Sequence, residues 1–258
     1  MGLKPLVVLA AVSVVSVLLA IEPAGAHSRH ALAFSIEACV VAMRTLSVPF
    51  PCLAVDQAED GTRGYAVIRA PLARSEVLIV PTAPIIGIES PALVVPATPA
   101  FFQVAWDARR FVVAALPRDP GWTGIGMAVN SRPYRSQDRL HIHVDCVQPS
   151  VAAALARFGP QIGERWMRFP VPLAGGRYFV RQVGAAQFAT MNPFASLREG
   201  VPAARRSMAD MTLAAVGTTL AGGRPGFILL AADTKAPGAG TAIGERLLDH
   251  TCGIAGEG

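Results

Sequence analysis

The sequence is poor in charged residues, and lysine is almost absent from it. Charged side chains make up 16% of the 258 residues, and nearly all of the 23 basic residues are arginine. No Lys/Arg-rich run occurs, and no basic patch is interleaved with aromatic residues, which argues against nucleic acid as a partner. The formal net charge of +5 and the planar guanidinium groups instead suit a phosphorylated small molecule or anionic lipid.

Histidine is scarce as well, with five residues in the chain. Two of them, His141 and His143, lie close together, and the other three form no second cluster. A metal site needs a third ligand near such a pair. Asp145 is the available neighbour, because the cysteines are expected to be oxidised. We therefore expect no metal and no other cofactor.

Internal repeats and low-complexity tracts are absent too. Hydrophobic residues make up 52% of the chain, which is enough to bury a sizeable core. A length of 258 residues allows one or two domains, and we expect a single domain over residues 27–258.

An apolar segment precedes this domain. Lys4 provides a short positive start, residues 5–21 carry no charge, and residues 24–26 resemble an A-x-A cleavage site. The apolar run is slightly short for a spanning helix, which needs about 20 residues. We expect residues 1–26 to be a signal peptide or a single-pass membrane anchor, and the domain to be exported.

Export favours disulfide bonds, and four cysteines allow three pairings. Cys39 and Cys52 are close in sequence, and we expect them to form one bridge. Cys146 then pairs with Cys252 and ties the histidine segment to the C-terminal segment. The loop-closure model assigns each bridge about 3–5 kcal/mol of stability.

Apolar periodicity and turn residues predict a mixture of strands and helices. Strands are predicted at residues 65–70, 76–81, 124–129, 136–146, 176–183, 212–219 and 227–232. Helices are predicted at residues 30–43, 99–116, 149–162, 192–210 and 242–250. Because most of these strands are joined as hairpins, we expect an α+β fold with an antiparallel sheet.

The strand at residues 136–146 carries the reactive groups. Its apolar residues alternate with polar ones, so one face can pack against a core. The other face presents two imidazoles, a guanidinium and a carboxylate. These belong to Arg139, His141, His143 and Asp145.

Two imidazoles on one strand face allow three functional interpretations. One imidazole can be a nucleophile that accepts a phosphoryl group, both can be metal ligands, or one can be a general base. The alternative is a pair of surface histidines on a solvated strand. The neighbouring Arg139 and the polar stretch at residues 130–138 favour a functional interpretation.

The connection that leads into this strand is rich in hydrogen-bond donors. Its hydroxyl, amide and guanidinium groups suit phosphate oxygens. They belong to Asn130, Ser131, Arg132, Arg135, Ser136 and Gln137.

The segment His141-Ile-His143-Val resembles the histidine-triad (HIT) signature, in which histidines alternate with apolar residues. More closely, the whole chain resembles the bacterial CDP-diacylglycerol pyrophosphatases. The matching stretches are Leu78-Ile-Val-Pro-Thr82, Gly87-Ile-Glu-Ser-Pro91, Phe101-Phe102 with Ala105-Trp106 and Ala108-Arg109, Ala128-Val-Asn-Ser-Arg132, Ser136-Gln137, His141-Ile-His143 with Cys146, Pro149, Asn192-Pro-Phe194, and Asp249-His250 before Cys252.

The resemblance implies a HIT-like antiparallel sheet with flanking helices, enlarged by extra segments. It places the nucleophile at His141 and the third triad histidine at His143, whereas Arg139 replaces the first. We expect the phosphate-binding side chains to be Asn130, Ser136, Gln137 and Arg139. His250 is expected to be structural.

The resemblance also implies an activity: hydrolysis of CDP-diacylglycerol to CMP and phosphatidate through a covalent CMP-histidine. Alternatives are a nucleotidyl transferase of the same superfamily, a metal-dependent phosphoesterase, and a periplasmic nucleotide- or lipid-binding protein without turnover. The expected location is the inner membrane with a periplasmic domain, or the periplasm if the leader is cleaved. The membrane surface is then a partner, with the proline-rich loop at residues 81–99 and Trp122 as candidate contacts.

Overall fold

The computed structural model describes residues 29–58 and 63–256. The expected signal peptide or anchor at residues 1–26 lies outside them. Among the described residues, no helix combines the length and the hydropathy needed to cross a membrane.

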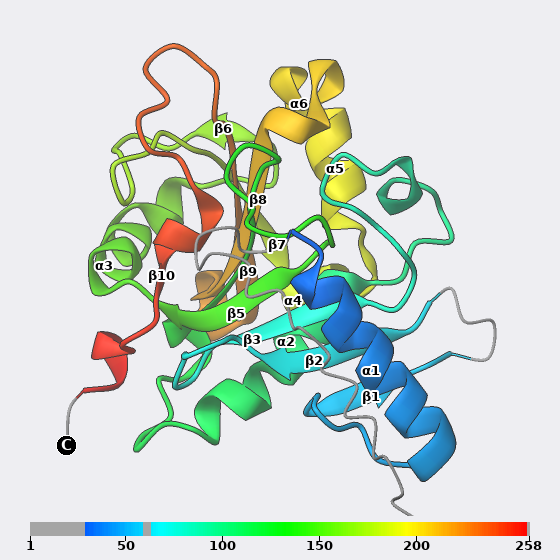
Figure 1. The fold of residues 1–258 in the computed structure, drawn as a ribbon. Coiled ribbons are helices and arrows are strands. Elements are labelled where there is room, and N and C mark those ends of the chain that lie inside the picture. The colour runs from blue at the N-terminus through cyan, green and yellow to red at the C-terminus, as the bar shows by residue number, and fades with distance from the viewer. Residues whose placement is uncertain (1–28, 59–62, 257–258) are drawn as a thin grey trace, which may run out of the picture.

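A ten-stranded antiparallel sheet runs through the molecule (Figure 1). Its order is β1-β2-β3-β5-β4-β8-β9-β7-β6, and β10 pairs with β5 off this path. The combination of helices with an antiparallel sheet is the α+β class that the sequence predicts. The strands are β1 (Ala54–Asp56), β2 (Tyr65–Arg69), β3 (Val77–Pro81), β4 (Ile125–Val129), β5 (Ile142–Val147), β6 (Met167–Arg168), β7 (Phe179–Gly184), β8 (Met211–Thr219), β9 (Pro225–Asp233) and β10 (Leu248–Asp249).

Helices cover both faces of this sheet. The α-helices are α1 (Ala31–Leu46), α2 (Phe101–Val113), α3 (Pro149–Phe158), α4 (Ala185–Thr190), α5 (Pro193–Gly200) and α6 (Pro202–Arg206). On one face, α2 packs against Ile142 and Val144 of β5 within the main hydrophobic core, to which α4 and α5 also contribute. The apolar half of the histidine strand is therefore buried, as its periodicity predicts.

The opposite face of the sheet has two separate apolar clusters with a polar strip between them. One cluster lies under α1 and includes Leu78 of β3, and the other lies under α3 and includes Ala128 of β4. Both residues are paired with His143 in the sheet register, so they share its face. The gap between the two covered regions is where the polar side chains of β5 lie.

Both expected disulfides are present. Cys39, in α1, is bonded to Cys52, and Cys146, in β5, is bonded to Cys252 near the C-terminus. The second bridge lies beside the pairing of β10 with β5, which matches Leu248 with Val147. The C-terminal segment is thus held against the central strand by both a covalent bond and a sheet ladder.

The histidine strand is shorter than predicted. It begins at Ile142 rather than at residue 136, because both neighbouring strands end near this point, β3 at Pro81 and β4 at Val129. The residues just before the strand bond to a loop instead: the amide of Leu140 donates to the carbonyl of Ile85. His141 consequently sits just before the ladder, at an open end of β5.

Two predicted helices are also wrong in part. The helix at residues 192–210 is divided into α5 and α6, because Val201 precedes Pro202 and takes an extended conformation. The helix at residues 242–250 is a 3₁₀ turn followed by β10, since pairing with β5 outweighs local helix propensity. The other predicted strands lie within three residues of those observed, whereas β1, β6, β10 and α4 were not predicted.

Candidate active site

The start of β5 places the two neighbouring histidines side by side. The ring centroids of His141 and His143 are 4.8 Å apart, and the residues are 5% and 6% exposed. They lie in the polar strip between the two covered regions of the sheet rather than in an apolar core. The pair is therefore shielded from bulk water while it keeps polar neighbours.

His141 is held in one tautomer by the backbone. Its Nδ1 lies 2.7 Å from the carbonyl oxygen of Arg139. Because a carbonyl can only accept, Nδ1 carries the proton and Nε2 keeps its lone pair. Burial, followed by the nearby charge of His143, lowers the pKa of His141 to about 4. The ring is neutral at neutral pH and has the properties of a nucleophile.

The pKa of His143 is shifted in the opposite direction. Burial acts to lower its pKa, but the hydrogen bond to Glu76 and the charges of Glu245 and Glu76 outweigh burial, so the pKa is raised. Its Nδ1 lies 2.6 Å from Oε1 of Glu76. Its buried Nε2 has no hydrogen-bond partner among the described residues and lies 3.7 Å from Oε2 of Glu245. A protonated Nε2 is therefore available to donate to a ligand oxygen.

Glu245 is brought to the histidines by Asn130. The Asn130 amide donates to Oε2 of Glu245 at 2.7 Å, and the Glu245 backbone amide donates to Oδ1 of Asn130 at 3.1 Å. A hydrogen bond from His250, and further contributions from His143 and Asn130, overcome burial and lower the pKa of Glu245 to about 2. Glu245 is thus a fixed negative charge beside His143.

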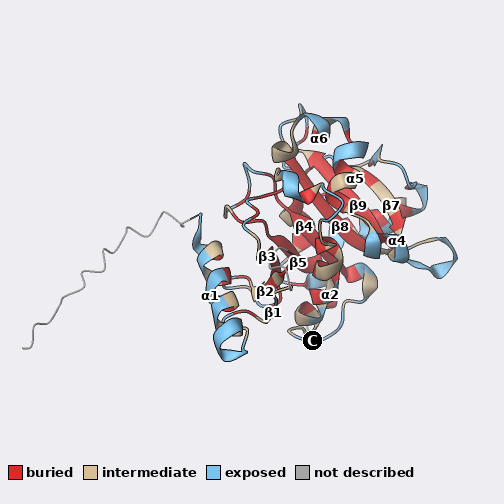
Figure 2. Ribbon diagram, turned by 90° about the vertical axis from the view of Figure 1, so that its right-hand side faces the viewer, coloured by how far each residue is buried: buried red, intermediate tan, exposed pale blue. Residues whose placement is uncertain are grey.

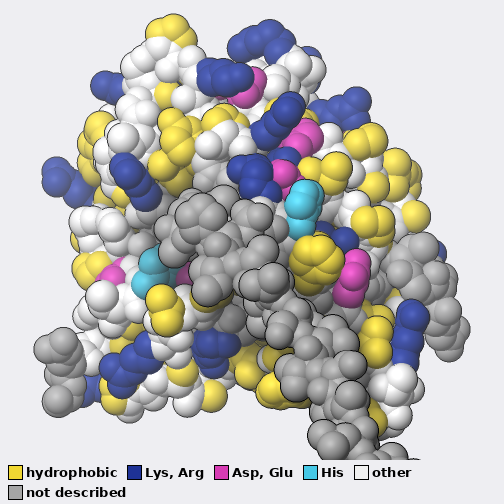
Figure 3. All heavy atoms as spheres, viewed as in Figure 1, with side chains coloured by type: hydrophobic (Ala, Val, Ile, Leu, Met, Phe, Trp, Pro, Cys, Tyr) yellow, Lys and Arg dark blue, Asp and Glu magenta, His cyan; other side chains and the backbone are white. Residues whose placement is uncertain are grey.

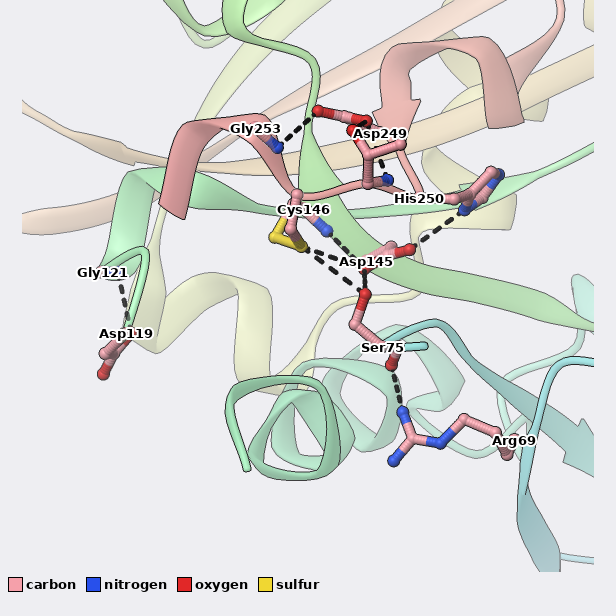
Figure 4. Close-up of a disulfide and its surroundings, with 11 residues drawn as sticks. Arg69, Ser75, Asp119, Gly121, Asp145, Cys146, Asp249, His250 and Gly253 are labelled. Atoms are coloured by element: carbon pink, nitrogen blue, oxygen red, sulfur yellow. Dashed lines mark hydrogen bonds and ion pairs between the residues drawn. A yellow bond between two sulfur atoms is a disulfide. The ribbon is translucent and has the colours of Figure 1, made fainter. Parts of the chain in front are cut away.

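His250 links this cluster to Asp145. Its Nδ1 lies 3.0 Å from Oδ2 of Asp145, and its Nε2 lies 3.6 Å from Oε1 of Glu245. The fully buried Asp145 also accepts from the Ser75 hydroxyl at 2.8 Å and from the Cys146 amide at 2.9 Å (Figure 4). Hydrogen bonds to Asp145 and Glu245 raise the pKa of His250 to about 10, so this ring is a cation at neutral pH.

Among the described residues, two groups of donor atoms have the spacing of metal ligands. Glu76, Glu245 and His250 offer atoms within 4.8 Å of one another. The carboxylates suit a divalent cation, but the His250 ring already bonds Asp145 and holds its proton. In the second group, with Asp145, both sulfur atoms belong to the Cys146–Cys252 disulfide and are not thiolate ligands.

The predicted phosphate-binding residues do not all face the histidines. Asn130 reaches the cluster through Glu245, and Ser136 is exposed. Gln137 accepts from the Leu32 amide at 2.9 Å, and Arg139 donates to the carbonyls of Pro81 and Thr82 at 3.1 and 2.7 Å. The roles of Ser136, Gln137 and Arg139 toward phosphate stay predictions.

A large charged cavity is lined by part of the connection that leads into the histidine strand. It has a volume of about 920 Å³, and Lys/Arg and Asp/Glu side chains gather together above the first turn of α1 (Figure 3). Arg135 lines it and is paired with Glu89 at 2.7 Å and Asp138 at 2.9 Å, and its charge also contributes to the lowered pKa of His141. The cationic lining consists of Arg29, Arg132, Arg135 and Lys235.

Sequence reasoning missed two acidic members of the cluster. Glu76 and Glu245 have no motif around them. His250, which is expected to be structural rather than catalytic, joins the cluster through Asp145 and Glu245. Trp122, a predicted lipid contact, is half-buried and packs against Trp106 with ring centroids 4.5 Å apart. Its indole N–H donates to the Gly226 carbonyl at 2.9 Å.

Comparisons with known proteins agree on one family. The family model described as CDP-diacylglycerol pyrophosphatase matches residues 27–256. A CDP-diacylglycerol pyrophosphatase from Yersinia pestis is 35% identical over 216 residues, which are 84% of this chain and 81% of that protein. The matched range includes the histidines of β5, the connection before them and the C-terminal segment with His250.

Proposed function

The chain belongs to the CDP-diacylglycerol pyrophosphatase family, and from this membership we propose that it hydrolyses the pyrophosphate bond of CDP-diacylglycerol to CMP and phosphatidate. The observation that carries the chemistry is the hydrogen bond from Nδ1 of His141 to the carbonyl of Arg139, which leaves Nε2 as the free nucleophile. The adjoining His143 has the opposite protonation preference. Two neighbouring groups with pKa values pushed apart form an acid–base pair.

In the first step, Nε2 of His141 attacks the cytidylyl phosphorus. The bond from this phosphorus to the bridging oxygen breaks, and phosphatidate leaves. His143 donates its Nε2 proton to the departing oxygen, while the Arg139 carbonyl continues to hold the Nδ1 proton of His141. The product is a covalent CMP-histidine, and one difficult displacement becomes two easier ones.

In the second step, water attacks the phosphorus of the CMP-histidine. His143, now neutral, takes a proton from this water as general base. The bond from phosphorus to Nε2 of His141 breaks, CMP is released, and His141 returns to its neutral form. Each histidine has then recovered its starting protonation state.

Positive charge and hydrogen-bond donors near the histidines would stabilise the transferring phosphoryl group. The arginines of the 920 Å³ cavity support this part of the proposal, because the charge of one of them, Arg135, also acts on the pKa of His141. Ser136, Gln137 and Arg139 are the further residues that we assign to phosphate binding. Arg139, in the place of the first triad histidine, keeps a cation there without a titratable imidazole.

We also propose a HIT-like relationship and an exported location. The antiparallel sheet and the His-x-His segment at the start of β5 support the first. The two disulfides support an oxidising compartment, consistent with the signal or anchor expected at residues 1–26. The domain would then act on lipid at the outer side of the inner membrane.

The covalent step can be tested by acid quenching and intact-mass analysis during turnover. The wild-type protein should carry a CMP adduct and release CMP, whereas His141→Ala should lose the adduct and at least about 10³-fold in rate. His143→Gln is the matched variant, because it should still form the adduct but at a reduced rate. Undiminished hydrolysis by His141→Ala would rule out the mechanism, and transfer of CMP to an added alcohol in preference to water would indicate a transferase.

A further inference from the structure

The outer side of α1 has an unusual surface for a helix at the edge of a protein. In Figure 2 the helix lies at the margin of the molecule, with β1–β3 on one side of it. Its inner side packs on the sheet through Leu32, Ile36 and Cys39. Its outer side and the following loop expose large apolar side chains, each 43–75% accessible: Phe34, Val41, Leu46, Val48 and Phe50.

A surface helix normally carries its charges on the solvent side. In α1 only Glu37 and Arg44 are charged, and the helix is apolar on both sides. Contiguous exposed apolar patches of this kind mark interaction surfaces. The Cys39–Cys52 disulfide joins the helix to the chain just after Phe50, so the patch has a fixed shape.

The patch is also connected to the candidate active site. Arg29, just before α1, is paired with Asp138 at 2.7 Å, and the first turn of the helix bonds to Gln137. A cavity of about 300 Å³ separates α1 from Arg139, and its lining includes Val41 and Arg44. A partner lying on the patch would therefore be next to Gln137 and Arg139, which shortly precede His141 in the chain.

We propose that the outer face of α1 and the loop through Phe50 form the surface that docks on a lipid bilayer. This rests on the proposed function, since the acyl chains of the substrate are held in a bilayer. The apolar run at residues 5–21 precedes α1 closely in sequence, which favours a membrane over a second copy of the chain as the occupant. Phe34, Val41 and Phe50 enter the interface, and Arg44, on the same helix, faces anionic headgroups.

The direct test uses the full chain with Phe50→Trp, mixed with vesicles that contain brominated phospholipid. Phe50 follows the C-terminal end of α1, a helix of 16 residues that is about 24 Å long, so an anchor before the helix does not by itself bring Phe50 to the bilayer. The added tryptophan fluorescence should be quenched, whereas in Met167→Trp, on β6 at the opposite end of the sheet, it should not. Equal quenching of the two variants, or none in Phe50→Trp, overturns the proposal.

A second test separates docking from catalysis. The double variant Phe34→Ser/Phe50→Ser should keep its rate on a water-soluble short-chain CDP-diacylglycerol within about twofold and lose at least several-fold on vesicle-held substrate, because two aromatic side chains no longer leave water. Met167→Ser should change neither rate. If the double variant loses the same fraction of the wild-type rate on both substrates, bilayer docking is contradicted. A wild-type dimer in sedimentation that the double variant abolishes would also contradict it. If the wild type hydrolyses neither substrate, the proposed function fails, and the quenching result still decides the docking surface.

Discussion

At the scale of single residues, one contrast dominates the site: two adjacent imidazoles are pushed toward opposite protonation states. His141 faces a backbone carbonyl and is neutral, whereas His143 faces Glu76 and Glu245 and favours its proton. The charge of His143 itself helps to lower the pKa of His141. This difference comes from the neighbours, because the two side chains are chemically identical.

Replacing Glu76 with Gln should therefore change how activity depends on pH. The pKa of His143 falls when the negative charge of Glu76 is removed, and the acid form of His143 is lost at lower pH. The basic limb of kcat/KM against pH should move down by at least about one unit, while the acidic limb, set by the pKa of His141 near 4, changes little. Glu199→Gln, an exposed and remote change of the same kind, is the control. A basic limb that does not move would separate Glu76 from the chemistry.

His250 makes a stability contribution whose pH range can be derived. Its folded pKa of about 10 lies above the ordinary value of 6.5, so the contribution is complete below pH 6.5 and disappears as pH rises through 10. His250→Gln should lower the melting temperature most at pH 6 and progressively less toward pH 10. Thermal unfolding of the variant and the wild type across this range measures the difference. A melting-temperature difference that is independent of pH would assign His250 a role other than charge pairing.

At the scale of elements, the C-terminal segment behaves as a second support for β5. The turn Gly244–Leu247 carries Glu245 to Asn130, and β10 with the Cys146–Cys252 bridge holds His250 at Asp145. The positions of Glu245 and His250 thus depend on how a segment about a hundred residues away in the chain packs against β5. Positioning of this kind is easily lost when the attachment is weakened.

Removal of that bridge should affect both stability and turnover. Cys146→Ala/Cys252→Ala opens a loop of 106 residues and should cost about 4–5 kcal/mol in urea unfolding, with a large loss of kcat because Glu245 and His250 are no longer fixed. Cys39→Ala/Cys52→Ala opens a much shorter loop of 13 residues and should cost about 3 kcal/mol while turnover of short-chain substrate persists. Equal losses of turnover in the two double variants would contradict the separate role of the C-terminal segment.

At the scale of the whole molecule, the sheet has one continuous apolar face and one divided face. The divided face leaves a polar strip between the regions covered by α1 and α3, and the histidines occupy it. The large charged cavity is lined by residues of the connection before β5, and α1 lines a smaller cavity together with Arg139. Under the proposed function, the charged headgroup and the acyl chains of the substrate would be received by different parts of the protein.

Under the proposed function, turnover should not require a divalent cation, because the cavity offers guanidinium groups to the pyrophosphate and His250 already lies as a cation among the carboxylates. CMP release should be the same within about twofold with EDTA and without it. The control is EDTA titrated back with excess Mg²⁺ or Zn²⁺. A loss with EDTA that either ion restores would favour a metal-dependent phosphoesterase.

The sequence alone determined the features that depend on residues close together in the chain. Alternation placed His141 and His143 opposite Ile142 and Val144, spacing paired Cys39 with Cys52, and hairpin-linked apolar runs indicated an α+β fold. Such features could be predicted because periodicity and short loop closure involve neighbouring residues. Residue resemblance then indicated the family before any distance was known.

Only the tertiary structure decided which groups control the histidines. Glu76 lies 67 residues from His143, and His250 lies 105 residues from Asp145, and neither pair has a local pattern that connects it. They meet because β3 and β10 both pair with β5, and the partner of a strand depends on the order of the whole sheet. The pKa of each imidazole depends on such partners and on burial, so the protonation states of the site were set by the fold rather than by the His-x-His segment.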